Sequence, residues 1–371
     1  MIDFEEYIRL GEPDKIEKSK NWLAAIGLQD VDGLKPSEYL IQNAKLNIEG
    51  KISFYEVRER INNYYIEKPV KDTNDRTEEA DKVSAAIAEI LSEKAFSFSP
   101  IEYITIHKRL FTGIYKFAGK IRDYNISKNE WVLDGESVFY ASFDNIQATL
   151  EYDFLQEKKF NYKGLSKGET VEHIAKFISG LWQIHLFGEG NTRTTAVFVI
   201  KYLRTFGFKV ENDLFAQNSW YFRNALVRAN YNNHEKGIYS TMEYLSRFFA
   251  NLLFNENYPL KNRVMHINFG KNDTVNENFD TVNAENDTVN EDFDTVNTEN
   301  DTVNEDFDTV NAENDTVFCL IKENLNITAV QISQKTGLSI ATIKRRIKEL
   351  KDLCKIKRVG SDKKGHWKIL G

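Results

Sequence analysis

Apolar residues recur three and four positions apart along most of the first 260 residues, which is the spacing of a helix with one buried face. In residues 171–185, VEHIAKFISGLWQIH, one such stripe contains Ile174, Ile178, Leu181 and His185. The same pattern occurs in segments 14–27, 36–46, 53–66, 78–96, 99–115 and 192–207. The pattern predicts a mainly α-helical fold.

Residues 121–143 interrupt the helical pattern. Apolar and polar residues alternate there around two turn signals, Asn129-Glu130 and Asp134-Gly135. Alternation between turn signals is typical of paired strands. We therefore expect a short β-hairpin flap inserted among the helices.

The last part of the chain has a different order of elements. Segments 317–326, 328–337 and 339–353 have helical character, and residues 354–370 alternate around Gly360 and Gly365 as a hairpin does. This order resembles a winged helix-turn-helix domain, whose third helix enters the major groove of DNA. The candidate DNA contacts on that helix and at the wing tip are Thr342, Lys344, Arg345, Arg346, Lys348, Lys363 and Lys364. A winged-helix fold that serves protein contacts is the alternative.

An acidic repeat with a period of seven precedes this part of the chain. DTVN recurs from Asp273 to Asp308, and each heptad offers too few apolar positions for a coiled coil. Asn, Asp and Thr are poor helix formers, and unbroken like charge extends a chain. We interpret the repeat as a flexible spacer; a weak helix or a partner-binding surface is the alternative.

Charge is distributed unevenly over the 371 residues, whose net charge is −7. Residues 271–317 hold fifteen acids and one base, whereas residues 318–371 hold thirteen bases and four acids. Together with the chain length, this predicts several units. We expect an N-terminal helical region at 1–95, a second helical domain at 96–270, the linker at 271–314 and the winged domain at 315–371.

Targeting signals are not evident in the sequence. Its first ten residues are charged, its longest apolar stretches are too short to span a bilayer, and its two cysteines form no disulfide or zinc pattern. We expect a cytoplasmic protein with no membrane partner.

The stretch HLFGEGNTRT, residues 185–194, collects several chemical groups where the predicted helix ends. Gly188 and Gly190 permit unusual backbone shapes, and a glycine-containing loop that leads into a helix N-terminus is a ready anion site. Arg193 adds a cation on the first turn, and Glu189 could hold Mg²⁺ together with substrate phosphates. The pattern favours a site for nucleotide phosphates; the alternatives are a surface turn and, for His185, a packed core residue.

The stretch resembles the Fic family motif HxFxxGNxRxxR, which His185, Phe187, Gly190, Asn191 and Arg193 match. The resemblance extends from about Phe96 to Phe254. Fic proteins mostly transfer AMP from ATP to a hydroxyl of a target protein. The resemblance therefore implies ATP and Mg²⁺ as cofactors and a Ser, Thr or Tyr hydroxyl of a target protein as acceptor. Duplex DNA and a second copy of the chain are further candidate partners.

The resemblance also implies a role for individual residues. His185 would be the general base, and Glu189 would carry Mg²⁺. The nucleotide phosphates would contact Gly188, Glu189, Gly190, Asn191, Thr192 and Arg193. Base recognition would use Phe222 and Asn230, which are otherwise ordinary helix positions. The flap residues Ile126, Ser127, Lys128 and Asn129 would align the target by strand pairing, unless the segment is only structural.

Two departures from the family pattern bear on function. Ala196 replaces the second Arg of the motif, which usually holds the γ-phosphate. Inhibited family members carry a helix ending in S/T-x-x-x-E-G/N; here Glu49-Gly50 matches its end, but Lys45 replaces the Ser or Thr. Glu49 is thus an inhibitory candidate or simply a helix C-terminus with its usual Gly. The alternative to an enzyme is a transcriptional regulator with a degenerate, nucleotide-sensing Fic fold.

Overall fold

The computed structural model of the chain describes residues 4–70, 75–208, 213–269, 316–325, 327–328, 331–332, 343, 347, 350–351, 355–359 and 366–369. The described residues belong to two compact units, one within Met1–Asp292 and the other within Phe293–Gly371.

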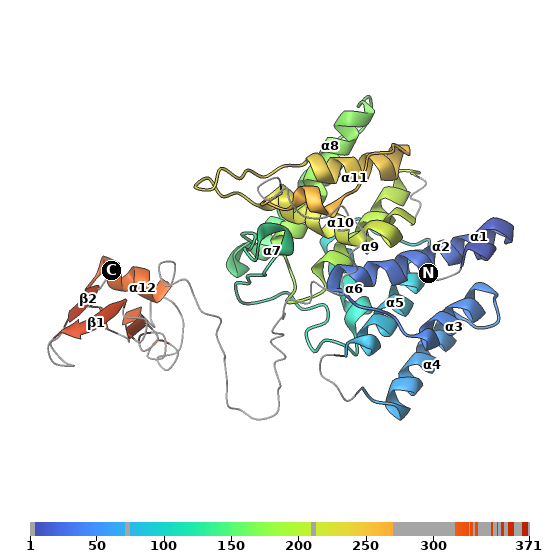
Figure 1. Cartoon of the computed structure of the whole chain (residues 1–371), viewed down its shortest axis with the longest axis horizontal. Coiled ribbons are helices and arrows are strands. Elements are labelled where there is room, and N and C mark those ends of the chain that lie inside the picture. The colour runs from blue at the N-terminus through green and yellow to red at the C-terminus, as the bar shows by residue number, and fades with distance from the viewer. Residues whose placement is uncertain are drawn as a thin grey trace. The chain divides into compact units, whose positions relative to one another are not determined.

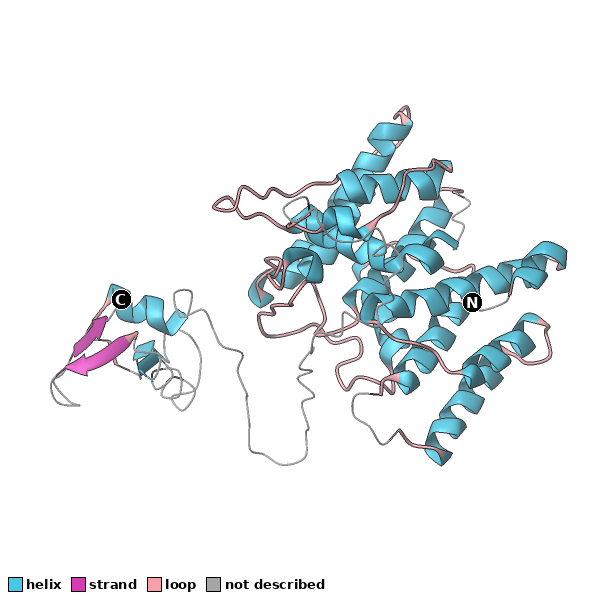
Figure 2. Cartoon of the chain, in the orientation of Figure 1, coloured by secondary structure: helices cyan, strands magenta, loops and turns pink. Residues whose placement is uncertain are grey.

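The first unit is a helical assembly (Figures 1 and 2). Its described α-helices are α1 (Glu5–Leu10), α2 (Pro13–Gly27), α3 (Glu38–Ile48), α4 (Phe54–Glu67), α5 (Thr77–Ser92), α6 (Pro100–Phe111), α7 (Ile146–Lys159), α8 (Lys167–Ile184), α9 (Asn191–Thr205), α10 (Asp213–Asn230) and α11 (Glu243–Phe254). Its short 3-10 turns are η1 (Leu28–Asp32), η2 (Trp131–Leu133), η3 (Phe143–Asn145) and η4 (Asn262–Met265). The predicted mainly α-helical fold is confirmed.

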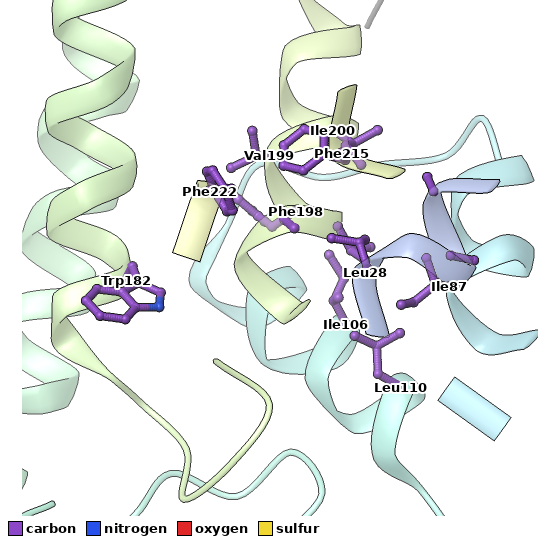
Figure 3. Close-up of a cluster of buried hydrophobic side chains, with 14 of the residues drawn as sticks. Leu28, Ile87, Ile106, Leu110, Trp182, Phe198, Val199, Ile200, Phe215 and Phe222 are labelled. Atoms are coloured by element: carbon purple, nitrogen blue, oxygen red, sulfur yellow. The ribbon is translucent and has the colours of Figure 1, made fainter. Parts of the chain in front are cut away.

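Two consecutive helices, α8 and α9, are joined by residues 185–190, which are the first part of the stretch HLFGEGNTRT. The capping box of Ser166 and Glu169 starts α8, and the apolar stripe of this helix lies fully inside the core. Every residue of α9 from Asn191 to Leu203 is buried. Figure 3 shows part of the surrounding core, to which α9 contributes Phe198, Val199 and Ile200. A loop held between two buried helices has little freedom to change shape.

The predicted flap hairpin at 121–143 is not formed as strands; the described backbone of this segment is extended and broken by η2. The turn signal at Asp134-Gly135 is confirmed, since these residues have φ of 57° and 83°, whereas Glu130 of the other signal is extended, with a φ of −109°. The hydrogen bonds of the two arms explain why residues 121–143 do not form paired strands. The N–H of Arg122 donates to Leu186 O at 2.9 Å and that of Ala141 donates to Gln183 O at 3.3 Å. The outer parts of both arms therefore bond to the end of α8, whereas the arms bond to each other nearer the turn, where Glu130 N donates to Glu136 O at 3.1 Å and Lys128 N donates to Ser137 Oγ at 3.0 Å.

The second unit contains α12 (Thr316–Glu323) and two strands, β1 (Ile356–Val359) and β2 (His366–Ile369). The strands pair antiparallel, with Ile356 opposite Ile369, so the predicted hairpin is confirmed. Trp367 is buried, and its indole N–H donates to Ile327 O at 3.0 Å. The acidic repeat and all seven candidate DNA contacts of the sequence analysis lie outside the described residues.

Among the residues that the structure describes, no helix is both long enough and apolar enough to cross a bilayer.

Candidate active site

His185 lies at the point where α8 ends. Its φ of 50° places it in the left-handed region, and its N–H donates to Trp182 O at 3.0 Å. The buried side chain of Arg122 donates to three carbonyls around this turn: His185 O at 2.7 Å, Ile184 O at 3.2 Å and Ala141 O at 2.5 Å. A cation that binds the last carbonyls of a helix satisfies groups that would otherwise lack partners. Arg122 therefore fixes the direction in which the chain leaves α8.

Asn191 closes the loop that follows. Its side chain accepts from Phe187 N at 3.0 Å and donates to Phe187 O at 2.7 Å. Gly190 has a φ of 76°, and a Cβ there would lie 2.3 Å from the ring of Phe111. The loop therefore requires a glycine at this position.

His107 of α6 supports the same loop from the inside. Its Nδ1 accepts from Gly119 N at 2.8 Å, so its Nε2 carries the hydrogen and donates to Glu189 O at 3.0 Å. Its ring stacks on Phe187 with the ring centroids 3.6 Å apart. Burial lowers the pKa of His107 to about 4, so this imidazole is neutral near pH 7. His107 is a positioning residue of the loop.

A small cavity with a volume of about 30 Å³ lies beside the loop and is partly open to solvent. Its lining consists of Asp32, Lys128, Glu130, Trp182, His185, Glu189, Gly190, Asn191, Thr192 and Arg223. Such a volume holds one or two waters, whereas pockets for drug-sized ligands are about 300–1,000 Å³. In this structure the cavity is therefore smaller than a nucleotide.

The imidazole of His185 is on the cavity wall and only 6% exposed. It packs against Tyr140, with the ring centroids 4.0 Å apart, and edge-on to Trp182 at 5.7 Å. Burial, and then the neighbouring cations Lys128 and Arg122, lower its pKa well below the usual value. Nδ1 has no hydrogen-bond partner among the described residues. His185 is thus a neutral imidazole with an unused nitrogen.

Lys128 of the flap forms an ion pair with Glu189 of the loop. Their side chains are 25% and 27% exposed, so the pair is partly in solvent and only weakly stabilising. Lys128, one of the four predicted flap residues, thus contacts Glu189, the predicted ligand of Mg²⁺. Ser127 and Asn129 are exposed and Ile126 is half-buried, and none of these three lines the cavity.

Arg193 is placed differently from its predicted role at the phosphates. Its side chain is fully buried, does not line the cavity, and stacks on Phe111. Its guanidinium contacts Glu79 at 2.6 Å, Asp32 at 2.8 Å and Gln29 at 3.0 Å. In this structure two carboxylates of the N-terminal region neutralise this cation.

The two predicted base-recognition residues also lie elsewhere. Phe222 is fully buried in the aromatic core, where its ring contacts those of Phe215 and Phe248; Figure 3 labels Phe222 and Phe215. Asn230 donates to Ser179 O at 3.2 Å and to Ser179 Oγ at 2.9 Å, which joins α10 to α8. Their side chains are used for packing and for helix contacts, so neither is available at the cavity in this form.

The inhibitory candidate Glu49 is likewise away from the cavity. Its carboxylate accepts from Tyr7 Oη at 2.6 Å and pairs with Lys51 at 2.5 Å. Glu49 is the C-cap of α3, and Gly50 follows with a φ of 75°. Glu49-Gly50 therefore forms an ordinary helix C-terminus in this structure, which is the alternative given in the sequence analysis.

Several residues at the site were not identified by the sequence analysis: Asp32, His107, Arg122, Glu130 and Arg223. Each comes from a segment distant from the loop, and no local pattern in the sequence connects them to it. Arg122 and Glu130 are charged and buried, with exposed fractions of 5% and 2%. A charged residue is rarely buried without a specific partner.

Two regions of the chain match models of known protein families. Residues 97–203 match the model of the Fic/DOC family, and residues 317–353 match a winged helix-turn-helix DNA-binding model. The chain therefore carries a Fic/DOC-family domain and a winged helix-turn-helix domain, as the motif and the order of elements predicted.

A curated relative is the protein adenylyltransferase VbhT of Bartonella schoenbuchensis, 24% identical over 167 residues. The match covers 45% of this chain and spans only a third (33%) of that relative. Among solved structures, the Fic domain of a putative cell filamentation protein of Bartonella quintana, with bound ADP, has 23% identity and a TM-score of 0.37, covering 47% of this chain and 82% of that one. A Fic family protein from Desulfovibrio desulfuricans has 12% identity and a TM-score of 0.40, covering 99% and 90%.

Proposed function

We propose that the protein transfers AMP from ATP to a hydroxyl group of a target protein, with His185 as the general base. The observation that carries the proposal is the juxtaposition of a neutral imidazole, an unused imidazole nitrogen and the glycine loop at the start of α9 on one cavity. The match to the Fic/DOC model and the similarity to an adenylyltransferase support it.

The loop supplies donors for phosphate oxygens. The first N–H groups of an α-helix have no intrahelical acceptor, and they favour an anion at that end. Asn191 and His107 hold this loop in one shape through Phe187 and Glu189 O. Preorganised donors of this kind stabilise charge that develops on a phosphate during transfer.

His185 would accept the proton of the target hydroxyl as its oxygen bonds to the α-phosphorus of ATP. The bond from that phosphorus to the bridging oxygen breaks at the same time, and pyrophosphate leaves with the electron pair. A neutral imidazole is the protonation state that this step needs. Neither a covalent enzyme intermediate nor a redox partner is required.

Glu189 is the residue on the loop that fits Mg²⁺. The described residues contain no cluster of three His, Cys, Asp or Glu side chains that could hold a metal ion by themselves. One carboxylate together with substrate phosphates is nevertheless a usual way of binding Mg²⁺. When bound, the ion would neutralise phosphate charge. Lys128 must then release Glu189, so flap opening and metal binding are coupled.

The small volume of the cavity also has a consequence for nucleotide binding. A nucleotide cannot enter a volume of about 30 Å³, so the flap must move away before binding. Because the Lys128–Glu189 pair is partly exposed, breaking it costs about 1 kcal/mol or less. We infer that opening of the flap admits the nucleotide and that closure aligns His185.

Incubation of the full chain with ATP labelled at the α-phosphate, Mg²⁺ and a cell lysate tests this function. We expect label on protein, on this chain or on a target, and we expect His185→Ala to reduce labelling by about 100-fold or more while nucleotide binding persists. His234→Ala, at an exposed position, is the matched control and should label normally.

A second candidate, a nucleotide-sensing transcriptional regulator, is favoured by two observations. Ala196 is fully buried and offers no charge to a phosphate, and the second unit matches a DNA-binding model. Nucleotide binding without labelling, and with identical behaviour of wild type and His185→Ala, would support the sensor and contradict the transferase.

A further inference from the structure

Arg223 of α10 is a cation on the cavity wall that the motif does not include. Its guanidinium donates to Val31 O at 2.7 Å and lies over the ring of Trp220 at 5.5 Å. Its side chain is 12% exposed. The side chain is therefore held in one direction, toward the cavity that His185 and Glu189 also line.

The charges on the cavity wall show why this cation matters. Among the described lining residues, Asp32, Glu130 and Glu189 are acids, while Lys128 and Arg223 are the Lys and Arg side chains. Lys128 is paired with Glu189 on the flap side. Without Arg223 the wall would repel a polyphosphate, because three carboxylates would face a single lysine.

The two arginines near the cavity differ in how tightly they are already bound. Arg193 contacts Glu79 at 2.6 Å and Asp32 at 2.8 Å. Arg223 contacts Glu130 at 3.3 Å and Asp32 at 3.5 Å. If Asp32 moves, Arg193 keeps its short pair with Glu79, whereas the longer carboxylate contacts of Arg223 are more easily exchanged.

Asp32 shows that an anion is accommodated beside Arg223. Its two carboxylate oxygens contact the two guanidinium groups from the end of η1. Burial by itself raises the pKa of Asp32, but Arg193 and then Arg223 outweigh burial and keep the pKa below its usual value. The field at this point favours negative charge strongly enough to offset desolvation.

We propose that Arg223 binds the terminal phosphates of the nucleotide in place of the motif arginine that Ala196 replaces, and that Asp32 holds this position until the phosphates displace it. This inference rests on the proposed nucleotide site. It makes Arg223 a specificity-determining residue for nucleoside triphosphates over monophosphates, since only the triphosphate extends to it.

The test compares binding of ATP and of AMP, each with Mg²⁺, to the full chain by calorimetry. Arg223→Gln keeps a donor for Val31 O but removes the charge, and we expect it to weaken ATP binding by about ten- to 100-fold. AMP binding should change by less than about threefold. Arg223→Lys should recover part of the ATP affinity, and Asp32→Asn should tighten ATP binding.

Arg247→Ala is the matched control, because Arg247 pairs with Glu243 on the surface of α11. It should leave both affinities unchanged. An equal loss for ATP and AMP in Arg223→Gln, or no loss, overturns the inference, provided that the wild type binds both nucleotides. A wild-type chain that binds no nucleotide contradicts the proposed function itself, and this inference fails with it.

Discussion

The backbone of a single residue, His185, determines where the chemistry of the site is located. The apolar stripe of α8 continues up to this position in the sequence, but the left-handed φ of 50° ends the helix at Ile184. A non-glycine residue in that region is strained by about 1 kcal/mol. The hydrogen bonds from Arg122 to the carbonyls of Ile184 and His185 offset this strain. The imidazole consequently lies on the cavity wall and not on the stripe.

His107 should make stability depend on pH in a predictable direction. Its pKa is about 4 in the folded chain and about 6.5 in the unfolded chain, so between these values the unfolded state binds one more proton. The free energy of unfolding therefore falls as pH is lowered from 6.5 toward 4, by up to about 3 kcal/mol from this residue. Chemical denaturation of the wild type and of His107→Gln at several pH values measures the effect.

The wild type should be more stable than His107→Gln at pH 7, and the difference should shrink as the pH falls. His234→Gln, changed at an exposed position, should follow the wild type at every pH. A constant difference between wild type and His107→Gln would show that the imidazole does not titrate as expected.

Residues of the site divide into those that sequence could and could not identify. His185, Glu189, Gly190 and Asn191 are neighbours in the chain, so spacing alone brought them together. Arg223 reaches the cavity only through long-range packing of its helix, which no local pattern encodes. Asp32 does so in the same way, from the N-terminal region. The buried pairing of Arg193 could not be predicted either, because its acidic partners are more than a hundred residues away.

At the scale of elements, the end of α8 organises its surroundings. Helical periodicity predicted α8 and α9 to within a few residues, because both bury a regular apolar face. The flap was predicted as a hairpin because alternation indicates extended backbone without indicating its partner. In the structure the partner is the end of α8, to which both arms donate. The turn at Asp134-Gly135 was predictable, whereas the turn expected at Asn129-Glu130 does not form and the choice of hydrogen-bond partner was not predictable.

Arg122 should therefore be required for both the stability of the first unit and the placement of His185. Arg122→Leu leaves several buried carbonyls without a donor, and we expect the free energy of unfolding to fall by about 2–4 kcal/mol. We also expect labelling to fall at temperatures where the variant is still folded. Denaturation curves and labelling rates, measured in parallel, give both quantities.

Arg122→Lys retains the charge but not the planar fork, so it should lie between the wild type and Arg122→Leu in both measurements. The control is Arg109→Ala, which removes an exposed pair with Glu93 and should change stability by about 1 kcal/mol or less. Full labelling by Arg122→Leu would show that the hydrogen bonds of Arg122 do not position the imidazole of His185.

At the scale of the whole molecule, a Fic/DOC-family domain and a winged helix-turn-helix domain occur in one chain. The body up to residue 270 is nearly neutral, whereas residues 318–371 hold thirteen bases against four acids. Such a charge excess attracts the DNA backbone irrespective of sequence. The arrangement suggests that the second unit brings the proposed transferase to DNA or to a target bound there.

Salt-dependent DNA binding is the outcome expected of this arrangement. The full chain should bind duplex DNA with an affinity that falls linearly with salt on logarithmic axes, because each phosphate contact releases counterions. Changing Lys344, Arg345 and Arg346 together to Ala should reduce the slope by up to about three. Changing the exposed Lys158, Lys159 and Lys163 of the first unit together to Ala is the matched control and should leave the slope unchanged. Equal slopes for both triple variants would favour a winged helix that serves protein contacts.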